Sequence, residues 1–214
     1  MLGRAHYIAD YRGGGSIPST LSLIESALLG GAGCVQVRSK ACTDGESFAL
    51  AKAAVGLCRG AGAACIVNDR VDIALAAGAD GAHIGPDDLP VAQARRILGP
   101  GLLLGASARD PGKALEAVAA GADYLGVGPC YLTASKEGLP GPIGPEGLAN
   151  VAVAVSVPVL AIGGVTAERV PELLRAGAYG VAVIGAIAAA PDPEAAAREI
   201  VSAINGALSE AAVQ

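Results

Sequence analysis

Short apolar runs alternate with longer runs rich in Ala and Leu along the whole chain. The short runs predict eight strands, at 6–9, 34–38, 64–67, 81–84, 102–105, 124–127, 159–162 and 180–184. The longer runs predict helices near 18–29, 46–60, 71–77, 90–98, 111–120, 145–154, 167–176 and 193–207. Strands that alternate with helices form βα units, and the strands of such units run parallel in one sheet.

Eight βα units in 214 residues predict one domain, residues 1–214, of the α/β class: a small (β/α)8 barrel, or TIM barrel. A Gly- and Ala-rich phrase recurs before the even-numbered strands, at 30–34, 77–81, 120–124 and 176–180. Glycine in a left-handed conformation closes a helix, and the small residues after it allow a tight turn into the next strand. A doubly wound open sheet is the competing fold. However, no G-x-G-x-x-G follows the first strand, where a dinucleotide-binding domain would carry it.

The composition excludes several classes of protein. With 15 basic and 20 acidic residues, a net charge of −5 and only six aromatic residues, the chain does not suit a general nucleic-acid-binding surface. Five cysteines without a C-x-x-C pair, and only two histidines, do not suit structural zinc. We therefore expect buried, reduced thiols. So apolar a chain is also compatible with a homodimer.

The mean hydropathy is high, at +0.51, and residues 147–167 carry no formal charge. Asn150 and Pro158 interrupt that stretch, and its alternating valines suit a buried strand better than a membrane-spanning helix. Arg4 and Asp10 stand where an export signal would need an apolar core. We therefore expect a cytoplasmic protein that does not span a membrane.

Polar residues gather at the carboxyl ends of the predicted strands, where a barrel builds its active site. Gln36, Arg38 and Lys40 alternate along the second strand, so their side chains share one face, and Val35 and Val37 take the other. A cationic face inside a barrel suits an anionic ligand. The alternative is a charge cluster that is merely solvated at the rim.

Two carboxylates follow neighbouring strands, Asp69 after the third and Asp88 after the fourth. We expect them to converge, with no evident lysine between them. Such a pair suits Mg²⁺, which binds one or two carboxylates together with water and phosphate oxygens. Two structural alternatives stay open: Asp69 could pair with Arg70, and Asp87 and Asp88 could cap the next helix.

Glycines follow the last two strands, at Gly163, Gly164 and Gly185. Their exposed N–H groups suit the phosphate cradle that barrels build at this place, although tight turns alone would also use glycine. The cradle would bind a monophosphate, whereas Arg38, Lys40, Lys136 and a metal would bind a diphosphate. The sequence thus predicts two phosphorylated substrates.

General-base chemistry has few candidates in this sequence. His83 and Ser107 are the neutral ones, and His83 is equally well explained as a packed, hydrogen-bonded strand residue. Departure of a diphosphate, stabilised by Mg²⁺ and cationic side chains, would need no strong base.

Seven motifs in order resemble the thiamine-phosphate synthase family, and together they span nearly the whole chain. They are the segments 36–40, 67–72, 79–89, 105–107, 121–129, 133–136 and 161–164. The resemblance implies a barrel enzyme that joins hydroxymethylpyrimidine diphosphate to thiazole phosphate, carboxylated or not, and releases thiamine phosphate and diphosphate. It implies a dissociative, Mg²⁺-assisted mechanism in which the thiazole nitrogen captures a pyrimidine cation.

The resemblance also implies residue roles. Arg38, Lys40, Ser107 and Lys136 would be catalytic, and Asp69 and Asp88 would bind Mg²⁺. The implied substrate-binding residues are Gln36, Val37, Arg38, Ser39, Lys40, Asn68, Ser107, Thr133, Ala134, Ser135, Lys136, Gly163, Gly164, Ile184 and Gly185.

Two positions depart from the common family pattern: Pro86 stands where Gln is frequent, and Gly185 where Ser is frequent. The Gly- and Pro-rich segment 138–144 is either a lid over the substrates or an ordinary surface loop. Three rival functions stay open: a thiazole tautomerase, a non-catalytic phosphometabolite-binding regulator on the same barrel, and an unrelated sugar-phosphate barrel such as an epimerase. The complete set of cations and carboxylates favours the synthase.

Overall fold

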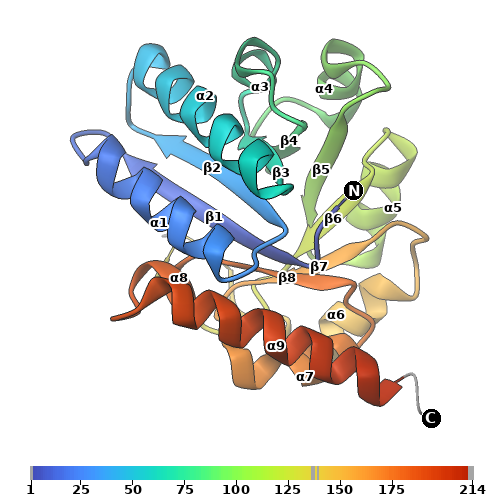
Figure 1. The fold of residues 1–214 in the computed structure, drawn as a ribbon. Coiled ribbons are helices and arrows are strands. Elements are labelled where there is room, and N and C mark those ends of the chain that lie inside the picture. Colours follow the sequence, from blue (N-terminus) through green and yellow to red (C-terminus); the bar gives the residue numbers. More distant parts are fainter. Residues whose placement is uncertain (1, 136–137, 139, 212–214) are drawn as a thin grey trace.

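The computed structural model describes residues 2–135, 138 and 140–211 (Figure 1). Its strands are β1 (Ala5–Arg12), β2 (Cys34–Lys40), β3 (Ala64–Asn68), β4 (Gly81–Ile84), β5 (Leu103–Ala108), β6 (Tyr124–Val127), β7 (Val159–Ile162) and β8 (Gly180–Val183). The helices are α1 (Ile17–Leu29), α2 (Asp44–Ala61), α3 (Val71–Ala77), α4 (Val91–Leu98), α5 (Pro111–Ala119), α6 (Gly144–Ala152), a 3₁₀ turn η1 (Ala167–Arg169), α7 (Val170–Arg175), α8 (Gly185–Ala188) and α9 (Pro193–Ala211).

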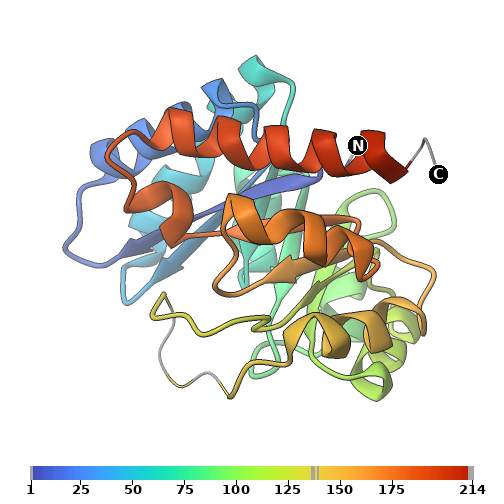
Figure 2. The same ribbon diagram turned by 90° about the horizontal axis from the view of Figure 1, so that it is seen from below.

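The strands close into a parallel barrel in chain order, with β8 pairing back onto β1. Helices surround this barrel in both views, and α9 runs beside α1 and α7 (Figures 1 and 2). The (β/α)8 barrel is therefore confirmed, and the doubly wound open sheet is excluded.

The main core lies between the strands and the surrounding helices. Val35 and Val37 are fully buried in it, while the alternating neighbours Cys34 and Gln36 lie on the other face of β2, inside the barrel. This separation of faces is the one that the alternation along 34–40 predicts. It leaves the inward face free to carry polar side chains toward the rim.

The recurring small-residue phrase turns each time as expected. Its second residue, Gly31, Gly78, Gly121 or Gly177, has a φ between +73° and +105°. Two of the four phrases add an aspartate: Asp80 accepts from the Cys65 N–H at 2.8 Å, and Asp123 from the Leu104 N–H at 2.8 Å. These bonds join each turn to the start of a neighbouring strand.

The structure differs from the predicted elements mainly at their ends. β1 and β2 are longer than predicted, because their backbone pairing continues past the apolar residues to Arg12 and Lys40. The predicted helix 167–176 opens as a 3₁₀ turn and becomes α-helical at Val170, with Pro171 in its first turn. The four-residue α8 was not predicted, since so short a helix shows no periodicity.

All five cysteines are free thiols, and only Cys42 is more than marginally accessible. Among the described residues, no helix has the length and apolar character needed to cross a membrane.

Candidate active site

The rim at the carboxyl ends of β1 and β2 carries a charged pair. The Asp10 carboxylate binds the Arg38 guanidinium, and both side chains are largely buried, with 10% and 15% of their surface exposed. Arg12 lies 3.3 Å from the other oxygen of Asp10 and also donates to the Ser135 carbonyl at 3.4 Å. Arg38 is therefore held inward by an ion pair and is not simply solvated at the rim.

Asp69 and Asp88 do converge, at the ends of β3 and β4. Burial, and then the hydrogen bond and negative charge of Asp69, raise the pKa of Asp88, whereas the Gly85 N–H and the charge of Lys40 lower it. Gly85 donates to Asp88 Oδ2 at 2.9 Å. One expectation was wrong: a lysine does stand at this pair, because Lys40 forms an ion pair with Asp69.

The backbone at Asp69 is strained. Its φ is +64°, a left-handed conformation that a non-glycine residue adopts at a cost of about 1–3 kcal/mol. The Arg70 N–H donates to the Asn68 carbonyl at 2.7 Å across it, and the Asp69 N–H donates to the His83 carbonyl of β4 at 2.7 Å. These bonds fix the carboxylate at the junction of β3 and β4, next to Asp88.

Neither structural alternative for the two aspartates is seen. Arg70 pairs with Asp44 and Asp72, each at 2.6 Å, instead of with Asp69. Helix α4 begins at Val91, and Pro90 is its N-cap residue with no side-chain cap hydrogen bond, so Asp88 does not cap it. Neither carboxylate is thus used in these structural roles; at the rim Asp69 meets Lys40, and Asp88 meets the Gly85 N–H.

The donor set fits Mg²⁺. Burial and then repulsion from Asp69 raise the pKa of Asp88. Both groups supply hard carboxylate oxygens, and a divalent cation between them would relieve that repulsion. Within the described ranges no cluster of three or more His, Cys, Asp or Glu residues could hold a metal. An ion bound here would therefore take its remaining ligands from water or from the oxygens of a substrate.

His83 forms hydrogen bonds inside the barrel. Its Nε2 lies 3.0 Å from Ser107 Oγ, and its Nδ1 lies 3.3 Å from the Tyr124 hydroxyl. The ring occupies space left by Gly105 and Gly126, whose added Cβ atoms would lie 2.4 Å and 3.1 Å from it. His83 is buried and Ser107 is exposed at the rim, so Ser107 is the member of this chain of hydrogen bonds that a ligand can reach.

His6 is the other histidine inside the barrel, at the amino end of β1. Its ring centroid lies 5.9 Å from that of Tyr124, and its Nε2 donates to the Gly3 carbonyl at 2.9 Å. Burial lowers the pKa of His6 to about 4, so the ring is neutral at pH 7. It therefore adds no charge beneath the rim.

The loops after β6, β7 and β8 meet on the opposite side of the rim. A Cβ on Gly164 would lie 2.5 Å from the Leu132 carbonyl oxygen, and a Cβ on Gly185 would lie 3.3 Å from Ser135 Oγ. Gly163 and Gly164 both have positive φ, at +89° and +64°. Bare backbone, together with the hydroxyl of Ser135, therefore forms this part of the site.

The remaining predicted site residues fall into three groups. Asn68, Thr133, Ala134 and Ile184 lie at the rim, at or after strand ends. Val37 and Ser39 point toward the helices: Val37 is fully buried there, and Ser39 accepts from the Ser47 hydroxyl at 2.8 Å. These two could touch a substrate only through their backbone. Lys136 lies outside the described residues.

Asp10 and Tyr124 contact predicted candidates, Arg38 and His83, but are absent from the predicted set. Asp10 stands opposite Arg38 in the register of β1 and β2, and the inward alternation of β1 could have indicated it. Tyr124 opens β6 and reads as core from the sequence, because nothing in one sequence shows that its hydroxyl meets His83.

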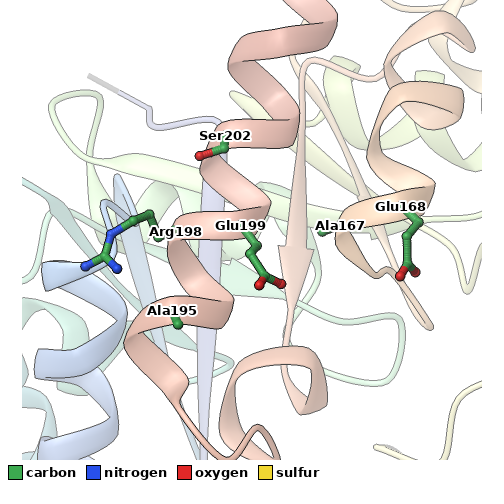
Figure 3. Close-up of a pocket in the computed structure, with 6 residues that line it drawn as sticks. All are labelled: Ala167, Glu168, Ala195, Arg198, Glu199 and Ser202. Carbon is green, nitrogen blue, oxygen red and sulfur yellow. The ribbon is translucent and has the colours of Figure 1, made fainter.

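The hollow drawn in Figure 3 is separate from this rim. It has a volume of about 620 Å³ and lies between η1 and α9 on the outside of the barrel. Glu168 and Glu199 line it, and its one cation, Arg198, pairs with Glu194 along α9. An acidic lining does not suit a phosphorylated ligand, so we assign no binding role to it.

The chain is similar to known proteins of one family. The profile of the family described as thiamine monophosphate synthase matches residues 12–187. The chain is 52% identical to thiamine-phosphate synthase of Salinispora arenicola over 208 residues, which are 95% of this chain and 98% of that protein. It is 46% identical to thiamine-phosphate synthase of Chlorobium luteolum over 87% of this chain and 88% of that one.

A solved structure shares the whole fold. It is described as thiamine phosphate pyrophosphorylase from Pyrococcus furiosus, and it is 36% identical with a TM-score of 0.84 over 96% of both chains. From the profile match, these identities and the closed barrel, the chain belongs to the thiamine monophosphate synthase family.

Proposed function

We propose that this chain is a thiamine-phosphate synthase that joins 4-amino-2-methyl-5-(diphosphomethyl)pyrimidine to thiazole phosphate. The observation that carries the proposal is the division of one barrel rim into two unlike halves. Arg38, Lys40, Asp69 and Asp88 form a charged half, and the glycine loops after β7 and β8 form a neutral one. The high identity to named synthases supports the same reaction.

The charged half would bind the pyrimidine diphosphate. Arg38 and Lys40 each already meet a carboxylate, so a bound diphosphate adds a second anion to cations that are held in place. Lys136, by resemblance, would add a further cation from the loop after β6. Holding the charges before the substrate arrives lowers the reorganisation needed as the leaving group departs.

Asp69 and Asp88 would hold Mg²⁺, and the bound ion would neutralise the charge that develops on the departing diphosphate. Asp69 would also position Lys40. Their ion pair keeps Lys40 near the rim, so that its ammonium group would face the same ligand.

The reaction needs no proton to be removed by the protein. The bond between the pyrimidine methylene carbon and the diphosphate oxygen breaks, and its electron pair leaves with the diphosphate. The thiazole nitrogen then donates its lone pair to the carbon, which gives thiamine phosphate. This is consistent with a rim whose histidine, His83, is buried under Ser107 and forms hydrogen bonds there.

Ser107 would contact the pyrimidine substrate as a hydrogen-bond donor. If Tyr124 donates to His83 Nδ1, the ring carries its proton on Nε2 and donates to Ser107 Oγ. The serine proton is then directed away from His83, toward a ligand at the rim.

The neutral half would bind the thiazole phosphate. Backbone N–H groups of Gly164 and Gly185, with the hydroxyls of Thr133 and Ser135, would surround the phosphate oxygens. Gly185 stands where serine is frequent in the family, yet Ser135 Oγ already lies 3.3 Å from the position of a Cβ there. In this chain Ser135 would therefore supply a hydroxyl near the place where the family serine usually brings one.

The test is to mix the purified protein with the two substrates, with and without Mg²⁺, and to follow thiamine phosphate by its oxidation to fluorescent thiochrome. Mg²⁺-dependent product is expected. If no product forms while thiazole phosphate still shifts the melting temperature, the proposal fails in favour of a tautomerase or a binding protein on the same barrel. An assay of thiazole isomerisation then separates those two.

A further inference from the structure

We infer that Arg169, in η1 outside the rim, is a positioning residue that holds the Gly163–Gly164 backbone ready for the thiazole phosphate. The inference rests on the proposed function, because it concerns the same phosphate cradle. Neither the sequence motifs nor the resemblance assigns Arg169, Tyr131 or Glu172 a role.

Arg169 belongs to a set of contacts between the loop after β6 and the start of α7, which we call the latch. Its Nη1 donates to the Gly164 carbonyl, and its guanidinium carbon lies 4.2 Å from the centre of the Tyr131 ring. The Tyr131 hydroxyl in turn donates to Glu172 Oε2 at 2.7 Å. The latch therefore ties Arg169, Tyr131 and Glu172 to one carbonyl of the glycine loop.

The glycine loop needs such support because glycine restricts its own backbone least. The Tyr131 N–H donates to the Gly163 carbonyl at 3.0 Å, so the carbonyls of Gly163 and Gly164 are both bound from outside. A peptide group is planar and its N–H points opposite to its C=O. Fixing these two carbonyls therefore aims the N–H groups of Gly164 and Val165 away from Tyr131 and Arg169.

The contacts of the latch stay formed at neutral pH, and its groups are engaged with one another and not with the phosphate. Burial, followed by the hydrogen bond to Glu172, raises the pKa of Tyr131 to about 12, so its hydroxyl stays a donor at neutral pH. The Arg169 guanidinium is engaged by a carbonyl and an aromatic face, and stacking of this kind fixes its plane. Lysine could still donate to the carbonyl but would lack the planar stacking group.

The test compares Arg169→Ala and Arg169→Lys with the control Arg175→Ala, which removes an exposed arginine from the last turn of α7. Each substrate is titrated at saturating levels of the other. Arg169→Ala should raise KM for thiazole phosphate by about 10- to 100-fold, the range expected for a charge-assisted hydrogen bond, and leave KM for the pyrimidine diphosphate unchanged. The value of kcat at saturation should stay within about 2-fold, because the bond to the diphosphate breaks on the other half.

Arg169→Lys should recover part of the loss, and Arg175→Ala should match the unmodified protein. Equal increases in both KM values, or no change in either, would overturn the inference. Circular dichroism melting separates a general loss of folding from a change confined to the cradle.

The failure of the proposed function is distinguishable from failure of this inference. If the unmodified protein has no synthase activity, the Kd of thiazole phosphate is measured by calorimetry for the same variants. The inference then requires the same ranking of the variants in Kd. An unmodified protein that binds no thiazole phosphate would refute the cradle and the latch together.

Discussion

The two halves of the barrel rim differ in the groups that form them. The half at β1–β4 consists of charged side chains paired with one another: Arg38 with Asp10, and Lys40 with Asp69 beside Asp88. The half at β6–β8 consists of glycine backbone packed against the neighbouring loop. The first half depends on paired charges, whereas the second depends on the shape of its backbone and on neutral hydroxyls. Substitutions in the two halves should therefore impair activity and stability in different ways.

The largest effect is expected from removal of one carboxylate of the charged half. Asp88→Asn should lower kcat by at least about 100-fold at saturating substrates, because the proposed Mg²⁺ site would lose a ligand charge. KM for thiazole phosphate should not change. The matched control is Asp87→Asn, which alters the exposed neighbour of Asp88 and should behave like the unmodified protein. Undiminished turnover of Asp88→Asn would remove the carboxylate pair from the mechanism.

In the neutral half, a substitution that changes the backbone should weaken binding of thiazole phosphate. Gly164→Ala places a Cβ 2.5 Å from the Leu132 carbonyl oxygen at a φ of +64°, so the loop must move. We expect KM for thiazole phosphate to rise by about 10-fold or more, and the free energy of unfolding to fall by about 1–3 kcal/mol. Gly101→Ala is the control, because nothing lies within 4 Å of a Cβ there. A stable, fully active Gly164→Ala protein would mean that this backbone does not hold the phosphate.

Substitution of Asp88 in the charged half should not lower stability, in contrast to Gly164→Ala. The pKa of Asp88 is raised in the folded protein, so the folded state binds more protons than the unfolded state between the ordinary and the raised pKa. The contribution of Asp88 to stability therefore falls as the pH rises through that window. Asp88→Asn should melt at the same or a higher temperature than the unmodified protein at pH 7 without Mg²⁺. Melting curves from pH 4 to 8 test this, and a lower melting temperature at pH 7 would contradict it.

The smallest effect is expected beneath the rim. Tyr124→Phe removes the hydroxyl that meets His83 and leaves the ring in place. If that hydroxyl sets the tautomer of His83, kcat should fall by about 3- to 10-fold, an effect of order 1 kcal/mol for one hydrogen bond. KM for thiazole phosphate should stay unchanged, since the neutral half is not touched. The control is Tyr11→Phe, whose hydroxyl contacts Glu46 near the start of α2.

The two halves also differ in how well the sequence predicts them. Alternation along 34–40 places Gln36, Arg38 and Lys40 on the inward face of β2, because the side chains of a strand alternate between its faces. The eight predicted strands are all present, and the barrel order places Asp69 beside Asp88. What the pattern could not show is that Lys40 reaches Asp69, since the pairing depends on the side-chain conformation of a long lysine.

The neutral half is harder to read from one sequence. Their place after the last two strands singles out Gly163, Gly164 and Gly185 among thirty-one glycines, but the sequence does not show what holds their backbone in place. The latch of Arg169, Tyr131 and Glu172 joins residues 41 positions apart at its widest. No periodicity relates them, because they meet only when the loop after β6 packs against the loop after β7.

The most direct test of two separate binding halves is calorimetric. Inorganic pyrophosphate and thiazole phosphate are each titrated into the protein, with and without Mg²⁺, and then one is titrated in the presence of the other. We predict that Mg²⁺ tightens pyrophosphate binding by at least about 10-fold, leaves the Kd of thiazole phosphate unchanged, and allows both ligands to bind together. Competition between the ligands, or an equal dependence of both on Mg²⁺, would contradict the division of the rim.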